Sequence, residues 1–595
     1  MKQRHFGRFL SVVLTLVMIS GILGACSKEP PFDPTDLSVR DYVGENGIVT
    51  AANPYASKVG LDVLKAGGNA FDAAVAVAFA ISVAEPDATG FGGGGLMLSY
   101  NVKTKESKYY NFREFASFSY DGSKTGAASK IAVPTQLAGL ARILQDTGTK
   151  SLQEILAPSI ALARDGVTIT PELASNISQN LEKILSSGDA AIEKAFTKDG
   201  LDPYGTGDKL IQPDLAKTLQ MVSDNGIESF YTGEFAEKLA QSIQDAGGYV
   251  TVDDLKYAMD NYPKSGSALT GSYGDYSILT CSSPSTGGTM LLEMLNMLEQ
   301  YKKTGSLTDL GHNSAEYVNL LATVEQLAYG DKEKYLADTA FVEAPVAGLL
   351  NKEYAASRLA KYKAGKAYLG TGLSETEQPF GDPTPYQDAK VTLYPSSAQE
   401  SHFSTTSFSV ADREGNLVTF TQTINNFFGS GVVMEGAGFF LNDQMRDFSA
   451  AGSINEPKAG KQPASYMMPT VLLKNGEPYA TLGTPGGTRI PSAMLQVILN
   501  MVEFDMDIQS AINAPRFFCF TTNETNRSST TKDILIEKAL SNLSAELTAM
   551  GYAVNVQGME EIDSYLGGVQ GIQFTNEGKL HGAADPRRDG KAFGY

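Results

Sequence analysis

The sequence has few of the residue types on which many catalytic and structural sites depend. Among 595 residues there are no tryptophans, three cysteines and four histidines. Cys281 and Cys519 lie far apart and form no CxxC pair, so we expect two buried free thiols and neither a zinc site nor a disulfide framework. No histidine lies beside a GxSxG turn and no HExxH motif occurs, which argues against a serine triad and a metalloprotease site. We therefore expect no metal and no cofactor.

Positive charge is also scarce. The chain has 48 Lys and Arg against 67 Asp and Glu, for a net charge of −19. No basic stripe with interleaved aromatic residues is present, so nucleic acid is not expected as a partner.

The first 25 residues are typical of an export signal. A basic start is followed by an apolar run that ends in Leu23-Gly24-Ala25-Cys26, which resembles the lipobox of bacterial lipoproteins. Lipidation of Cys26 would anchor the mature protein outside the cytoplasm, with residues 26–44 as a polar tether. A plain signal anchor is the alternative, but the run is short for a span of roughly 20 residues. Removing residues 1–25 removes three basic groups and takes the net charge from −19 to −22.

The rest of the chain alternates helices and strands without a clear linker. Residues 152–364 are mostly amphipathic helix, and strands dominate from residue 403, including GVVMEGAGFFL. Two later segments, SAMLQVILNMVEF and ILIEKALSNLSAELTAMG, are predicted to be helical. Helices first and antiparallel hairpins later predict one α+β or αββα layered domain.

A small-residue helix is predicted over residues 69–84, with Asn69 as its N-cap. The following GFGGGG stretch fits GxGxxG as a bare pattern. Because a helix precedes it and a strand follows it, the dinucleotide-binding arrangement is reversed and we reject that function.

The stretch SHFSTTSFSVAD contains a candidate nucleophile, Thr405. With no suitable histidine, an N-terminal threonine could use its own α-amine as the base, which requires cleavage after Ser404. Folding the following hairpin about Glu414-Gly415 pairs Thr405 with Ile424. A one-residue change in the loop would pair it with Thr423 or Asn425 instead.

This stretch closely resembles the autocleavage site of the γ-glutamyltransferase family, which typically has TTHxSVxDxxGNxVxxTxTxN where this chain has TTSFSVADREGNLVTFTQTIN. The similarity continues in GGNAFDAAVAVAFAISVAEPDATGFGGGG, NFREFA, SPSTGGTMLLEMLNMLE, FFLNDQMRDF, TLGTPGGTRI and the C-terminal HGAADPRRDGKAFGY. Together the matches cover nearly everything from residue 47 to 595.

The resemblance implies an N-terminal-nucleophile αββα fold, with two mainly antiparallel sheets between helical layers. Self-cleavage between Ser404 and Thr405 would give a large subunit, residues 45–404, and a small subunit, residues 405–595, of one domain. The implied residue roles are catalysis by the Thr405 nucleophile, with Thr423 near its amine and Gly486 and Gly487 at the oxyanion, and substrate binding by Arg113, Asn425, Gln444, Asp447 and Ser465.

Three departures from the family pattern are visible. Tyr466 replaces the second serine of the usual PLSSM segment, where its phenol could still donate a hydrogen bond to substrate. Ser407 stands where histidine is usual. The connection from Asp447 to Ser465 is too short for the lid loop of some members, which predicts an open cleft.

The implied function is that of a lipid-anchored γ-glutamyltransferase or glutathione hydrolase. Glutathione or a related γ-glutamyl amide would be the donor, and water, an amino acid or a peptide the acceptor. One alternative is a relative that processes poly-γ-glutamate or acts as a cephalosporin acylase. Another is an uncleaved surface lipoprotein that binds amino acids without turnover.

Overall fold

Two antiparallel sheets of seven strands each form the centre of the molecule. A computed structural model describes residues 32–368, 379–388, 394–395, 404–519, 533–557 and 566–595. The first sheet has the order β1 (Tyr42–Gly44), β20 (Leu580–Ala584), β19 (Gln570–Phe574), β15 (Glu477–Gly483), β14 (Thr470–Lys474), β11 (Tyr276–Thr280) and β10 (Leu269–Tyr273). The second has the order β21 (Lys591–Gly594), β2 (Gly47–Ala51), β12 (Thr406–Asp412), β13 (Leu417–Thr423), β3 (Gly94–Asn101), β4 (Glu106–Phe112) and β9 (Lys264–Gly266).

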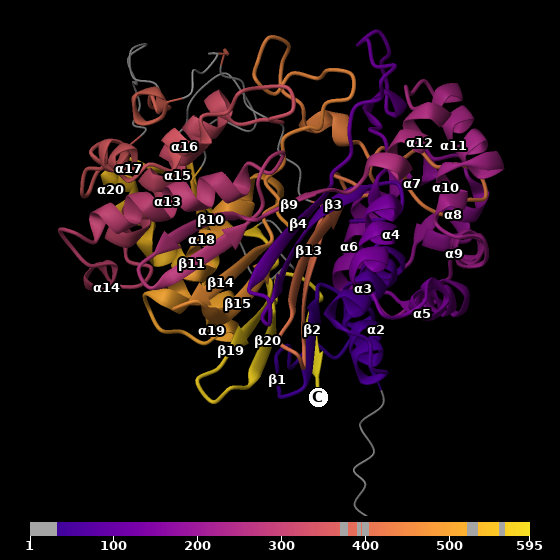
Figure 1. The fold of residues 1–595 in the computed structure, drawn as a ribbon, viewed down its shortest axis with the longest axis horizontal. Helices are drawn as coiled ribbons and strands as arrows, with labels where there is room; N and C mark the ends of the chain where they lie inside the picture. Colours follow the sequence, from indigo (N-terminus) through magenta and orange to yellow (C-terminus); the bar gives the residue numbers. More distant parts are fainter. Residues whose placement is uncertain (1–31, 369–378, 389–393, 396–403, 520–532, 558–565) are drawn as a thin grey trace, which may run out of the picture.

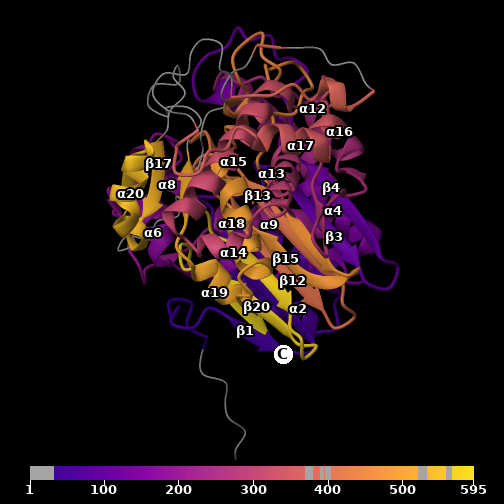
Figure 2. The same ribbon diagram turned by 90° about the vertical axis from the view of Figure 1, so that its left-hand side faces the viewer.

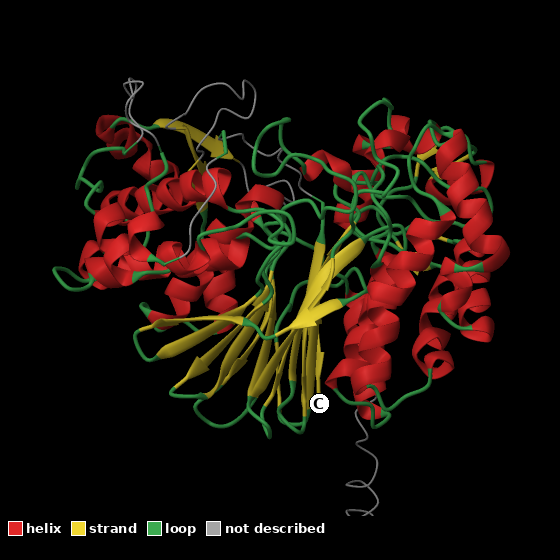
Figure 3. Cartoon of the chain, turned by 45° about the horizontal axis from the view of Figure 1, so that its top comes forward, coloured by secondary structure: helices red, strands yellow, loops and turns green. Residues whose placement is uncertain are grey.

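A layer of helices covers the outer face of each sheet (Figures 1 and 3), which confirms the predicted αββα sandwich. On the side of the second sheet lie α2 (Pro54–Lys65), α3 (Ala70–Ala84), α4 (Gln136–Thr147), α5 (Leu152–Asp165), α6 (Pro171–Gln179), α7 (Leu181–Leu185), α8 (Ala190–Phe196), α9 (Pro213–Asn225), α10 (Glu228–Tyr231), α11 (Gly233–Asp245) and α12 (Val252–Asn261). On the other side lie α13 (Gly287–Tyr301), α14 (Leu307–Leu310), α15 (Ala315–Tyr335), α16 (Val346–Leu349), α17 (Lys352–Leu359), α18 (Ile490–Val502), α19 (Ile508–Asn513) and α20 (Ser544–Met550). Seen from that side, α13, α15 and α18 lie in front of the sheets (Figure 2).

Short elements complete the fold. The remaining strands are β5 (Val167–Thr168), β6 (Thr197–Lys198), β7 (Asp202–Pro203), β8 (Lys209–Leu210), β16 (Phe517–Cys519), β17 (Asp533–Glu537) and β18 (Ala553–Gln557). The 3₁₀ helices among the described residues are η1 (Ala128–Lys130), η2 (Thr384–Tyr386), η3 (Gln444–Asp447), η4 (Gly487–Arg489) and η5 (Lys538–Leu543). Two of them, η3 and η4, lie at the candidate site.

The helix predicted over residues 69–84 is α3, and its start is fixed by a capping box. The Asn69 side chain accepts hydrogen bonds from the backbone N–H groups of Phe71 and Asp72, and the Asp72 carboxylate accepts from the N–H of Asn69. Every residue of α3 is buried, because its small side chains allow neighbouring helices and the β12–β13 hairpin to pack closely.

The two faces of the β12–β13 hairpin have different chemistry. Phe408 and Phe420 face the helical layer and stack with their ring centroids 4.8 Å apart. On the opposite face the Ser409 hydroxyl donates to the Gln570 carbonyl (3.2 Å), and the Thr419 hydroxyl donates to the Leu482 carbonyl (3.2 Å). The alternation of aromatic or aliphatic residues with hydroxyl residues thus joins this hairpin to the helices on one side and to the first sheet on the other.

Two predicted elements are wrong. The segment ILIE at the start of the second late helix is strand β17, paired antiparallel with β16 and parallel with β18, and only Ser544–Met550 is α-helical. Its isoleucines favour a buried strand once these neighbours are available. GVVMEGAGFFL forms no strand and takes part only in isolated bridges, Val433 with Phe440 and Leu441 with Gly92, because Gly436 and Gly438 have left-handed backbone conformations that interrupt an extended chain.

The described part of the segment expected to be a tether contacts the fold. Strand β1 pairs with β20, the Arg40 guanidinium donates to the Arg588 carbonyl (2.7 Å), and the Phe32 and Tyr55 rings pack 5.1 Å apart. Ordered packing therefore extends to residues before 45. Cys26 and the rest of the first 31 residues lie outside the described part.

Cys281 and Cys519 are buried and free, as predicted. Within the described ranges, no helix combines the length and apolar character needed to cross a membrane.

Candidate active site

Thr405 lies at the start of the hairpin, opposite Thr423. The observed register pairs Thr406 with Gln422 and Ala411 with Leu417, so the next position places Thr405 across from Thr423. The predicted pairing with Ile424 is therefore wrong by one residue, and the pairing with Thr423, left open as an alternative, is confirmed. The cause is a turn in which Asp412 and Asn416 still pair (N–H to carbonyl, 3.2 Å) while Gly415 adopts a left-handed conformation.

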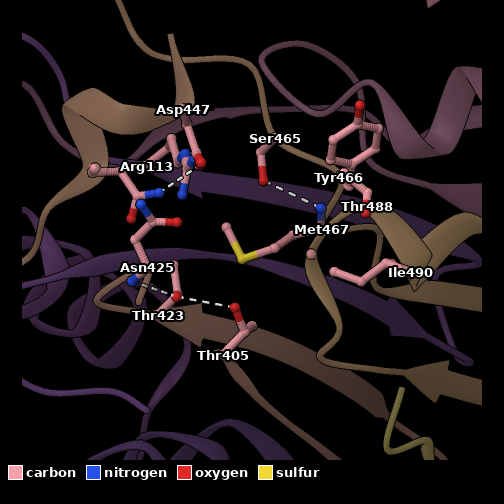
Figure 4. A pocket seen from close by; sticks show the side chains of 12 residues that line it. Arg113, Thr405, Thr423, Asn425, Asp447, Ser465, Tyr466, Met467, Thr488 and Ile490 are labelled. Carbon is pink, nitrogen blue, oxygen red and sulfur yellow. Dashed lines mark hydrogen bonds and ion pairs between the residues drawn. The ribbon is translucent and has the colours of Figure 1, made fainter. Parts of the chain in front are cut away.

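The two threonines are joined by a hydrogen bond. The Thr405 hydroxyl donates to the Thr423 hydroxyl oxygen (3.0 Å), which also accepts from the backbone N–H of Asn425 (2.8 Å; Figure 4). Thr405 is 6% exposed and has a φ of +123°. A β-branched residue is strained in this conformation, so the backbone at Thr405 is held by its surroundings in a high-energy conformation.

Ser404, on the other side of the proposed cleavage bond, is buried. Its hydroxyl donates to the Ala88 carbonyl (3.2 Å), in the segment that follows α3. Ala88 also accepts from the N–H of Ile424 (3.3 Å), so one short segment contacts both strands that carry the threonines.

The glycine run after α3 allows the hairpin to lie close to its neighbour. A Cβ atom on Gly93 would lie 2.1 Å from the Thr423 carbonyl oxygen, which no side chain could tolerate. Strand β3 then pairs with β13 along its length. The run therefore fixes the position of the strand that ends at Thr423.

A charged cluster stands across the pocket from Thr405. The Arg113 guanidinium donates to the Asp447 carboxylate, and the Gln444 amide donates to the same carboxylate oxygen (2.6 Å). Asn425 comes from the end of β13 with a left-handed φ of +81°, and its side chain donates to the Asp443 carbonyl (3.1 Å). These four residues, predicted to bind substrate, all line the pocket that also holds Thr405 and Thr423.

Glu114 is a site residue that the sequence analysis missed. It is fully buried, and its carboxylate lies 3.7 Å from the Arg113 guanidinium. Burial raises the pKa of Glu114 to about 7, although Arg113 opposes the shift and Asp447 adds to it. Its place beside Arg113 in the NFREFA segment was the available signal, but adjacent side chains in an extended segment usually point to opposite faces.

Ser465 and Tyr466 both line the pocket, but with different orientations. The Ser465 hydroxyl oxygen accepts from the backbone N–H of Met467 (3.1 Å), which leaves its proton available to a substrate oxygen. The Tyr466 hydroxyl instead donates to the Glu333 carboxylate (3.2 Å) and points away from Thr405 (Figure 4). The structure therefore brings the Tyr466 residue to the pocket but not its phenol, and the expected hydrogen bond to substrate needs another donor.

The glycines expected at the oxyanion lie directly before α18. Gly487 lines the pocket, and Gly486 and Gly487 have φ values of +133° and +56°. A Cβ on Gly486 would lie 3.2 Å from Gly567. Only glycine suits this turn, which begins the 3₁₀ helix and then α18, and the N-terminus of a helix favours negative charge.

Ser407, which replaces the usual histidine, lies in the interface between the sheets. Its hydroxyl donates to the Phe420 carbonyl (2.8 Å), and a Cβ on Gly483 would come within 2.2 Å of it. A larger side chain would not fit here without displacing β15.

The pocket is small, with a volume of about 30 Å³. Arg113 and Asp447 both line it and pair with one another. A ligand that carries both a carboxylate and an ammonium can exchange this single pair for two, one with each protein group.

The sequence and the fold of this chain are similar to those of known proteins. A sequence model of the family described as Gamma-glutamyltranspeptidase matches residues 56–595. The chain is 35% identical to the glutathione hydrolase proenzyme of Bacillus subtilis (strain 168), over 100% of this chain and 99% of that protein. It is 33% identical to the glutathione hydrolase proenzyme of Escherichia coli (strain K12), over 99% of each. Among solved structures, cephalosporin acylase from Bacillus halodurans aligns with a TM-score of 0.78 at 25% identity, covering 96% of this chain and 99% of that one.

The buried Glu114 carboxyl predicts a pH-dependent stability. Because its folded pKa is near 7 and the unfolded value is 4.5, the folded state binds more protons between these values, and this group makes the protein less stable as pH rises through that window. Glu114→Gln removes the effect, so relative to wild type the variant should gain on the order of 2–3 kcal/mol between pH 5 and 8.

The measurement is the difference in melting temperature between variant and wild type across that range. Glu237→Gln, at an exposed position on α11, is the control and should show a constant difference. A constant difference for Glu114→Gln as well would contradict the assignment.

Proposed function

Because this chain belongs to the γ-glutamyltranspeptidase family, we propose that it removes γ-glutamyl groups from glutathione or related amides and passes them to water, an amino acid or a peptide. The observation that carries the proposal is the Thr405–Thr423 hydrogen bond in the same pocket as the Arg113–Asp447 pair. Thr405 supplies a nucleophile, and the Arg113–Asp447 pair recognises the carboxylate and the ammonium of an amino acid.

The first reaction is maturation of the precursor. The Thr405 oxygen attacks the Ser404 carbonyl carbon, the peptide C–N bond breaks, and the departing nitrogen takes a proton, which leaves an ester. Water then hydrolyses this ester, which restores the Thr405 hydroxyl, leaves a carboxylate on Ser404 and makes Thr405, with its free α-amine, the start of the new chain. The strained φ of Thr405 favours the first step because breaking the bond releases the strain.

The second reaction uses the freed threonine. Its amine accepts the hydroxyl proton while the oxygen attacks the γ-carbonyl of the donor, and the backbone N–H groups at Gly486 and Gly487 stabilise the oxyanion. The leaving amine takes the proton, and water or another amine then attacks the acyl-enzyme. Arg113 and Asp447 hold the α-carboxylate and α-ammonium, with Asn425, Gln444 and Ser465 adding polar contacts.

We further propose that the mature protein is a lipoprotein outside the cytoplasm. The LGAC sequence supports this, and Cys26 comes shortly before Phe32, whose ring packs against Tyr55 of α2 and Phe593 of β21. A Cys26→Ser variant should appear in the soluble fraction of cells instead of the membrane fraction, while cleavage of the chain is unchanged. Retention in the membrane would favour the signal-anchor alternative.

A second candidate function is acylase chemistry on the same nucleophile, and the structural similarity to a cephalosporin acylase supports it. The buried Arg113–Asp447 pair favours an amino-acid head group over an acyl group without an ammonium. A non-catalytic amino-acid-binding lipoprotein is disfavoured by the strained, hydrogen-bonded Thr405.

Maturation is expected to give two subunits. The smaller should begin at Thr405 and give TTSFSV by N-terminal sequencing, whereas Thr405→Ala should remain a single chain. Ser409→Ala, which changes a buried hydroxyl on the same strand, is the control and should be cleaved normally. Active wild-type protein that runs as one intact band would contradict the N-terminal-nucleophile mechanism.

Loss of either head-group charge should impair turnover. Arg113→Ala or Asp447→Ala leaves a buried charge without its partner and should lower kcat/KM for γ-glutamyl-p-nitroanilide on the order of 10²- to 10⁴-fold. Arg142→Ala, at an exposed position, should leave the rate unchanged. A normal rate in Arg113→Ala would remove Arg113 from substrate binding.

The short connection from Asp447 to Ser465 predicts that longer γ-glutamyl chains can enter. We expect cleavage of poly-γ-glutamate that is slower than cleavage of glutathione and rises with added salt, since an acidic protein repels an anionic polymer and screening acts beyond roughly 8 Å at 0.15 M. Glutamate release from both donors over a salt series measures this. Normal glutathione turnover with no polymer cleavage at any salt concentration would mean that the cleft is covered.

A further inference from the structure

The loop between Asp447 and Ser465 is held together from inside by buried polar side chains. Asn455 is 3% exposed and Lys461 is fully buried, which is unusual for surface loops. Because the two ends of this loop are substrate-binding residues, its internal hydrogen bonds also determine the shape of the pocket.

Asn455 connects the two ends directly. Its amide nitrogen donates to the backbone carbonyl of Asp447 (2.8 Å), and its amide oxygen accepts from the backbone N–H of Ala464 (3.1 Å), next to Ser465. Its own carbonyl accepts from the N–H of Ser449 (2.9 Å). One side chain therefore fixes the separation between the carboxylate expected to bind the ammonium and the serine expected to bind the carboxylate.

Two further residues of the loop make related contacts: Lys461 binds the residues beside Asn455, and Gln462 binds Arg113. The Lys461 ammonium donates to the carbonyls of Ile454 (2.7 Å) and Glu456 (3.1 Å), the residues on either side of Asn455. The Gln462 amide donates to the Arg113 carbonyl (2.6 Å). The loop thus contacts all three groups that surround the substrate head.

We propose that Asn455 is a positioning residue that sets the place of Asp447 relative to Ser465, and so determines how strongly the enzyme prefers donors with a free α-ammonium. This rests on the proposed function of the site. Asn455 itself does not line the pocket, and it acts through the backbone of its neighbours.

The experiment compares two donors that differ only at the α-position. The donors are γ-glutamyl-p-nitroanilide and glutaryl-p-nitroanilide, which keeps the carboxylate but lacks the amino group. Asn455→Ala removes the side-chain hydrogen bonds to Asp447 and Ala464, and a longer one to the Ser449 hydroxyl (3.3 Å), so kcat/KM for the γ-glutamyl donor should fall about tenfold to hundredfold. For the glutaryl donor, which has no ammonium to place, the fall should be about threefold or less.

Asn455→Asp separates the two bonds, because a carboxylate can accept from Ala464 but cannot donate to the Asp447 carbonyl. The Asn455→Asp variant should lose the preference for the γ-glutamyl donor over the glutaryl donor, as Asn455→Ala does. Ser453→Ala is the matched control: it removes a buried hydrogen bond to Ala450 in the same loop (2.7 Å) and should keep the wild-type preference.

Self-cleavage and melting temperature are measured for each variant. If a cleaved, folded Asn455→Ala protein keeps the wild-type ratio of kcat/KM for the two donors, whether or not both rates fall, the proposal is overturned. Failure of both Asn455 variants to fold would also overturn it, by showing that Asn455 serves the fold. Wild-type protein inactive on both donors would instead refute the proposed function.

Discussion

The site depends on one cross-strand contact, the pairing of Thr405 with Thr423 at the open end of the β12–β13 hairpin. Strand pairing has a period of two, so a shift of one residue would turn the Thr405 side chain to the opposite face of the sheet. The register is set at the far end, where Gly415 closes the turn, and it is maintained by the hydroxyl contacts of one face and the Phe408–Phe420 stack of the other. The position of Thr405 is thus a property of the whole hairpin.

The site also requires a local positive charge, supplied by Arg113, in a protein that is acidic as a whole. Arg113 lies between the carboxylates of Asp447 and Glu114, both buried, and burial raises the pKa of Glu114 to about 7. An amino acid is well matched to such a site, because it adds one charge of each sign and leaves the total unchanged. A purely anionic ligand would find the arginine already neutralised.

The sequence predicted the layered fold well because its signals are local. The capping box of α3, the hydrophobic periodicity of the helices and the alternation in the late hairpins each depend on residues close together in the chain. The errors occurred where distant partners decide: ILIE becomes a strand because β16 and β18 lie beside it.

The predictions for the candidate site divide in the same way, into local features that the sequence pattern predicted and long-range contacts that it did not. Neighbouring residues placed Thr405 near Thr423, although the turn geometry that fixes the register was not determined by composition. The contact between Arg113 and Asp447 spans most of the chain, and no periodicity predicts it, so only the resemblance to a family brought the two together. Glu114 and Asn455 were missed because their importance follows from burial and from backbone partners, which a sequence does not display.

The strand order has a consequence for the proposed cleavage between Ser404 and Thr405. In the second sheet, β12 lies between β2 from before residue 404 and β13 from after it, and β2 lies between β12 and β21. In the first sheet, β14 pairs with β11 and β20 pairs with β1, so each sheet contains strands from both pieces. Dissociation of the two pieces would break ladders in both sheets and expose both faces of the core, so dilution alone should not separate them. Such a cut would create a new chain end without creating a new module, and neither piece could be exchanged or inherited as an independently folding unit.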